Sequence, residues 1–142
     1  MKRVIFCVAL CCVASACVPL PNAKTNAMDA EIARTTPHCV GPRLCKAAWE
    51  GARDWVLANC PMKIQTITDT YIQTYNTGEY SAQIECAVSK TMDPAGGNTI
   101  TLSVGCNNLF GCDPGTRHAE LSFNRYVDGI ISEFESAPAH TR

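Results

Sequence analysis

Ten of the 142 residues are cysteines, and six of these lie between positions 39 and 112. In a small exported domain an even number of cysteines is typical of a disulfide framework, and six thiols allow fifteen pairings. Two short segments with turn-forming residues each begin and end in cysteine: Cys39-Val-Gly-Pro-Arg-Leu-Cys45 and Cys106-Asn-Asn-Leu-Phe-Gly-Cys112. Closing these two rings leaves one pair, so we expect the disulfides Cys39–Cys45, Cys106–Cys112 and Cys60–Cys86.

A metal site or a thiol-redox site is the alternative use of these cysteines. Both usually place two cysteines at CxxC spacing, and neither cysteine ring has that spacing. The sequence therefore favours structural disulfides, and we expect neither a bound metal nor a cofactor.

The N-terminus has the pattern of an export signal. Lys2 and Arg3 precede an uncharged apolar run over residues 4–14, which ends in Ala14-Ser15-Ala16-Cys17. As a helix this run is about 16 Å long, too short to cross a hydrocarbon core of about 30 Å. We therefore expect residues 1–16 to be a signal peptide rather than a membrane span.

Two peptidases fit the cleavage site. Ala14 and Ala16 suit ordinary signal peptidase, which would release a soluble protein that begins at Cys17. Small residues followed directly by cysteine also resemble the lipobox of bacterial lipoproteins, in which that cysteine is diacylated and becomes the mature N-terminus. The resemblance departs from the usual pattern at Ala14, where that family commonly has Leu. Val18, rather than Asp, after the cysteine resembles the outer-membrane sorting pattern of these lipoproteins.

The remaining chain divides into a tether, one domain and a tail. Residues 17–41 are polar and contain proline, which predicts a lipidated tether with at most a short helix over residues 29–34. Residues 42–136 carry regular helix and strand patterns and are long enough for one domain. Residues 137–142 are expected to form a flexible tail.

The pattern over residues 42–136 predicts a two-layer α+β domain. Apolar residues recur at helical spacing from Pro42 until Cys60-Pro61 ends the helix. Residues 62–68, 70–76, 81–90 and 99–106 have β-forming or alternating composition. A second amphipathic helix is expected from Asp113-Pro114, with Asp113 as its N-cap. We therefore expect helix, four-stranded antiparallel meander, helix, with both helices on one sheet face.

Little in the sequence points to catalysis or to nucleic-acid binding. Twelve basic and thirteen acidic residues give a formal charge of -1, which offers no surplus of cations for phosphates. Of the three histidines, His38 borders the tether, His140 lies in the tail and His118 lies at a helix start near acidic residues. A solvated surface role explains His118 without an acid–base function. Trp49 and Trp55 fall on one helical stripe, which favours core packing.

Two surface segments are candidates for binding a partner. If Ile72 faces the core, its neighbours Tyr71 and Gln73, and with them Tyr75, point to the uncovered sheet face. Exposed tyrosines contribute large contact area in interfaces, although ordinary cross-strand packing also explains them. The second candidate is Leu109 with Phe110, inside the ring from Cys106 to Cys112. These two either dock onto a partner or fold over the end of the second helix.

Taken together, the signal, Cys17 and a small disulfide-bearing α+β domain resemble the small envelope lipoproteins of Gram-negative bacteria. The resemblance implies an outer-membrane protein that faces the periplasm and is held in the membrane by a lipid on Cys17. It brings no catalytic residues, so we expect a non-enzymatic protein that binds or supports an envelope protein partner. The alternative is a soluble secreted or periplasmic domain, an inhibitor or a small enzyme, released by ordinary signal peptidase.

Overall fold

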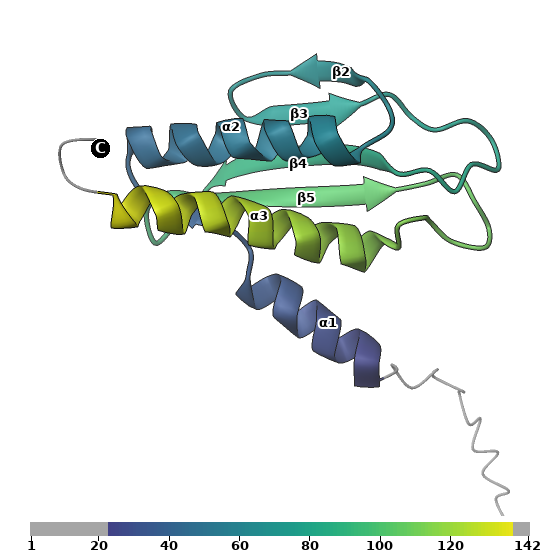
Figure 1. The fold of residues 1–142 in the computed structure, drawn as a ribbon, viewed down its shortest axis with the longest axis horizontal. Coiled ribbons are helices and arrows are strands. Elements are labelled where there is room, and N and C mark those ends of the chain that lie inside the picture. Colours follow the sequence, from purple (N-terminus) through teal and green to yellow (C-terminus); the bar gives the residue numbers. More distant parts are fainter. Residues whose placement is uncertain (1–22, 138–142) are drawn as a thin grey trace, which may run out of the picture.

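The computed structural model describes residues 23–137, and the expected signal peptide, Cys17 and residues 138–142 lie outside that range. Its helices are α1 (Ala23–Arg34), α2 (Pro42–Asn59) and α3 (Thr116–Ser136). Its strands are β1 (His38–Cys39), β2 (Ile64–Ile67), β3 (Tyr71–Thr74), β4 (Glu85–Met92) and β5 (Asn98–Gly105). The strands form one antiparallel sheet in the order β1-β5-β4-β3-β2. Helices α2 and α3 lie side by side across one face of this sheet, and α1 lies beyond α3 (Figure 1).

The α+β class is therefore correct, but the described chain has five strands and not four. The additional strand β1 comes from residues assigned to the tether. It pairs with the start of β5 through His38 opposite Thr99 and Cys39 opposite Asn98. A two-residue strand is too short to show alternation, so the sequence pattern could not predict it. Gly97 makes the pairing possible, because a side chain there would lie 2.5 Å from the Cys39 carbonyl oxygen.

The short helix expected over residues 29–34 belongs to a longer one, because residues 23–34 form the three-turn helix α1. No residue of α1 is fully buried, so the segment has no core stripe for a sequence analysis to detect. Its C-terminal end is held by Asn124 of α3, whose buried side-chain amide donates to the Ile32 carbonyl at 3.0 Å. That carbonyl is among those that a helix leaves without an internal partner at its end. Ion pairs Asp29–Arg117 and Glu31–Arg125 add to the contact between the two helices.

We expect Asn124→Leu to loosen α1 from α3. Leucine has the same branching at Cγ but cannot donate to the Ile32 carbonyl or to the Thr35 hydroxyl, so both hydrogen bonds from Asn124 to this segment are lost. A hydrogen bond of this kind contributes about 1 kcal/mol. Amide hydrogen exchange measured by mass spectrometry should accelerate in peptides from residues 23–36. The control is Ser132→Leu at an exposed position of the same helix, which should leave that exchange unchanged. Equal exchange rates in the two variants would show that Asn124 does not hold α1.

The core lies between the sheet and the two helices α2 and α3. Trp55 of α2 meets Phe123 of α3 edge to face, with ring centroids 5.4 Å apart. Gly51 lets the helices approach closely, because a side chain there would collide with Ile130. The sheet contributes buried aliphatic residues from its three central strands: Ile72, Val88, Ile100 and Leu102. This arrangement matches the expected two layers, with both long helices on one face.

The starts of α3 and β4 differ from the sequence expectation. Helix α2 runs from Pro42 to Asn59 as expected, but α3 begins at Thr116, after Gly115. Asp113 is not its cap, because the N-cap position is Gly115. The Asp113 backbone N–H instead donates to the Ala82 carbonyl at 2.7 Å. The same contact explains why β4 begins at Glu85 and not at residue 81. Residues 81–84 lie against the segment before α3, where Gln83 forms an isolated bridge to Asp113.

Candidate functional site

The face of the sheet opposite α2 and α3, which we call the open face, is lined by small and polar side chains. Strand pairing places them in rows across the three central strands. One row is Tyr71, Ser89 and Thr101, and the next is Gln73, Ala87 and Ser103. The intervening row, Ile72, Val88 and Leu102, is buried under the helices. No helix or strand among residues 23–137 packs on the open face (Figure 1).

Both candidate tyrosines belong to this face. Tyr71 is 37% exposed and Tyr75 is 54% exposed, while Ile72 between them is fully buried. The Tyr75 N–H donates to the Lys63 carbonyl at 2.9 Å, so the extended pairing continues one residue beyond β3. Alternation along the strand then turns both rings to the same side. The Tyr71 hydroxyl donates to Gln73 Oε1 at 3.3 Å, which links two of the predicted residues.

A shallow cavity of about 160 Å³ adjoins these residues at the end of the open face. It is lined by Gln73, Ala87, Ser103 and Gly105, together with Glu85. Glu85 is held in place there, because its Oε2 accepts the backbone N–H of Thr77 at 2.9 Å. The sequence analysis missed this cavity. Its signal is the run of small residues at paired positions of β4 and β5, which is visible only once the register is known.

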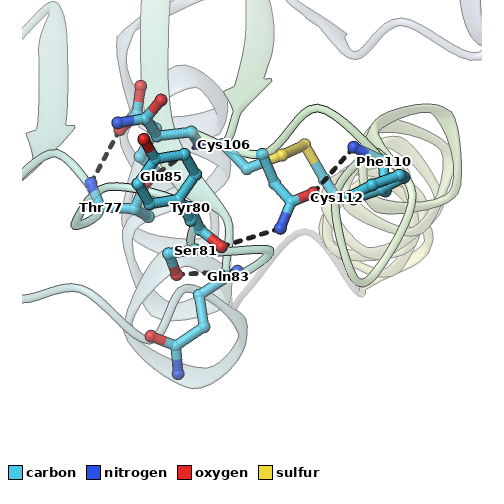
Figure 2. The surroundings of a disulfide bond; sticks show 10 residues. Thr77, Tyr80, Ser81, Gln83, Glu85, Cys106, Phe110 and Cys112 are labelled. Carbon is cyan, nitrogen blue, oxygen red and sulfur yellow. Dashed lines mark hydrogen bonds between the residues drawn. A yellow bond between two sulfur atoms is a disulfide. The ribbon is translucent and has the colours of Figure 1, made fainter.

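The ring from Cys106 to Cys112 lies where β5 ends, away from the rows of the open face. Leu109 is 92% exposed and Phe110 is fully exposed, so they do not fold over α3. The Asn108 side chain holds this loop, because it accepts the Phe110 N–H and donates to the Tyr80 carbonyl, both at 2.8 Å. Figure 2 shows these two bonds beside the disulfide that closes the ring.

A larger cleft opens between α2 and the β2 edge of the sheet. It has a volume of about 730 Å³ and is lined in part by Trp49, Arg53, Asp69 and Lys90. The Lys90 ammonium lies 4.9 Å from the centroid of the Trp49 ring, a cation–π distance. Trp55 is in the core as expected, whereas Trp49 packs on the core with one side and lines this cleft with the other.

The described histidines have separate surroundings. His38 Nε2 lies 2.9 Å from the Gly96 carbonyl and 3.7 Å from Asp93. His118 lies in the first turn of α3, and the structure gives it no side-chain bond to an acid. Nearby, partial burial raises the pKa of the Glu120 carboxyl, although the positive charge of Arg117 opposes the shift. The folded state therefore binds the carboxyl proton of Glu120 more tightly than the unfolded state does. As the pH rises through the raised pKa, ionisation of Glu120 slightly lowers the free energy of unfolding.

Residues 23–137 contain no group of three or more His, Cys, Asp or Glu side chains placed to hold a metal ion. None of their helices is both long and apolar enough to cross a bilayer. Comparisons of the chain with protein-family models, with curated proteins and with solved structures found no match.

Proposed function

We propose that this chain is a non-enzymatic envelope lipoprotein of a Gram-negative bacterium. In this proposal a lipid on Cys17 anchors it in the outer membrane, and the open face of its sheet binds a protein partner in the periplasm. We propose a binding function and not an enzymatic one, because the candidate features are two exposed surfaces, the open face and the ring from Cys106 to Cys112.

The disulfides support the proposed compartment. The structure joins Cys39 to Cys45, Cys60 to Cys86 and Cys106 to Cys112, the pairs expected from the spacing. Disulfides persist in the periplasm and outside the cell and are rare in the reducing cytosol. The segment that precedes the domain has the pattern of an export signal that ends at a cysteine. Both features fit a chain that crosses the inner membrane before it folds.

The observation that carries the binding proposal is a sheet face that exposes two tyrosines and is covered by no element of the described chain. Tyrosine rings contribute a large apolar contact area and lose few rotatable bonds on binding. On the two neighbouring strands β4 and β5, the rows opposite Tyr71 and Gln73 consist of short Ser, Thr and Ala side chains, so a partner can approach the backbone closely there. Tyr71 and Tyr75 are about 13 Å apart along the strand, a span that fits one protein surface.

We expect the double variant Tyr71→Ala, Tyr75→Ala to lose its partner while it keeps its fold. Interface tyrosines often contribute more than about 1 kcal/mol each, so recovery of the partner should fall about tenfold or more. Recovery is measured by affinity capture from detergent-solubilised envelopes, followed by quantitative mass spectrometry. The matched control is Tyr126→Ala, which removes a 46% exposed tyrosine from α3.

Two results would contradict the binding proposal. One is equal recovery of every captured protein by the double variant and by Tyr126→Ala, with both variants folded. The other is a fall in melting temperature of about ten degrees or more in the double variant, because exposed substitutions usually change stability by less than about 0.5 kcal/mol. Such a fall would mean that the tyrosines serve the fold and not recognition.

A further inference from the structure

The ring from Cys106 to Cys112 has the chemistry of a membrane-contacting loop. Its two most exposed side chains are Leu109 and Phe110, and none of its seven residues carries a charge. The disulfide constrains the loop, so the loop loses little further conformational entropy when these side chains bind a surface. Leu and Phe favour the boundary between headgroups and acyl chains over water.

Two backbone N–H groups at this tip are hydrogen-bonded within the protein. The Phe110 N–H donates to Asn108 Oδ1 at 2.8 Å, and the Gly111 N–H lies 3.4 Å from the Asn108 carbonyl. The Asn108 side-chain amide in turn donates to the Tyr80 carbonyl. A loop that enters a lipid interface must bring few unpaired amides with it, because lipid offers them no partners. These bonds remove that cost for the N–H groups of Phe110 and Gly111.

The first turns of α1 lie beside this ring. Thr25 and Met28 of α1 line the same cavity of about 410 Å³ as Gly111 and Cys112, which directly follow Phe110. The Asp29–Arg117 pair fixes this end of α1 against the start of α3. Figure 1 shows the first turn of α1 and the loop that leaves β5 at the same end of the molecule.

The length of chain before α1 limits how far this end can lie from a lipid on Cys17. Ala23 is the sixth residue after Cys17, and an extended chain of that length spans at most about 22 Å. An anchored lipid therefore holds the ring close to the bilayer surface. Two apolar side chains bind membranes weakly alone, but beside an anchor their contact becomes intramolecular and takes place at a high effective concentration.

We propose that the Leu109–Phe110 tip is a second membrane contact, which inserts into the lipid interface next to the acyl anchor. The inference rests on the proposed anchoring at Cys17 and adds an orientation to it. The open face and the ring belong to different parts of the surface, so the tip meets the bilayer while the open face stays available to a partner.

The experiment uses the mature acylated protein in vesicles of phosphatidylethanolamine and phosphatidylglycerol, part of which carry brominated acyl chains. Phe110→Trp places a fluorescent reporter at the tip, and Met92→Trp is the control, because Met92 is 85% exposed at the end of β4 that lies away from the ring. Both variants retain Trp49 and Trp55 as a common background. We expect bromines near the interface to quench the fluorescence added by Phe110→Trp at least about twice as strongly as the fluorescence added by Met92→Trp.

Flotation of the same vesicles in a density gradient tests whether the lipid attaches the protein to the membrane, independently of whether the tip contacts it. If the protein floats and the two variants are quenched equally, the proposed membrane contact of the tip is wrong, while the proposed lipid anchor stands. Protein that does not float overturns the anchor, and the tip then has no bilayer beside it. A third outcome combines two results: Phe110→Trp is not quenched, and the double variant Leu109→Asn, Phe110→Asn loses a captured partner. That outcome would overturn the membrane contact and show that the tip binds a protein instead.

Discussion

Replacing both Cys60 and Cys86 with alanine should lower the free energy of unfolding by about 3–4 kcal/mol. This disulfide closes a loop of 27 residues, counted from 60 to 86 inclusive, and ties the end of α2 to β4. Both sulfurs are in the core, with Cys60 7% and Cys86 2% exposed, so the substitution also removes buried contacts. For a domain of this size the melting temperature should fall by about 10–20 °C. Denaturant unfolding followed by circular dichroism measures the change.

The matched control is Cys106→Ala, Cys112→Ala, which opens a ring of seven residues on the surface. Because loop-closure entropy grows with loop length, this variant should lose about 1 kcal/mol less than the first. An equal or smaller loss for the Cys60 and Cys86 variant would show that the bond does not join the two layers. Peptide mapping without reduction checks the pairing itself, and free thiols or crossed links would contradict it.

We expect Cys17→Ser to move the protein from the membrane fraction to the soluble fraction while the domain stays folded. Serine cannot accept the thioether-linked lipid, and stable anchoring requires more than a single acyl chain. Cys17 precedes the described domain, so circular dichroism and melting temperature should not change. The measurement is immunoblotting of fractions after a high-salt wash of the membranes.

The control for this release is Cys12→Ser, which removes a thiol from the expected signal peptide and leaves Cys17 in place. It should stay in the membrane fraction. Sedimentation of Cys17→Ser with the washed membranes would mean that something other than a lipid on this residue holds the protein there.

Where local patterns were strong, the sequence was sufficient to predict the structure. The apolar stripe from Cys45 to Val56 predicted α2, and the strict alternation of Ile100, Leu102 and Val104 predicted β5 and its buried face. The two cysteine rings follow from spacing alone, because a short loop brings its own ends together. Strand alternation predicted Tyr71 and Tyr75 on the open face on the condition that Ile72 faces the core, and Ile72 is fully buried.

The features that were missed depend on contacts between distant segments. Helix α1 is held by Asn124, which lies 92 residues from its partner Ile32, and no pattern within α1 reports that contact. Strand β1 exists because Gly97 leaves room for Cys39. The cleft at Trp49 is lined jointly by α2 and by the turn after β2, and helical spacing within α2 cannot show which residues of another segment lie opposite it.

The most direct test of the proposed anchoring is the intact mass of the mature protein purified from membranes of its native host. The account predicts a chain that begins at Cys17, lacks residues 1–16 and carries additional mass equal to a diacylglyceryl group, with or without a further acyl chain. Fragmentation should place that mass on the N-terminal residue. An unmodified N-terminus at Cys17, or a mature chain that begins elsewhere, would contradict the lipid anchor and favour a soluble exported domain.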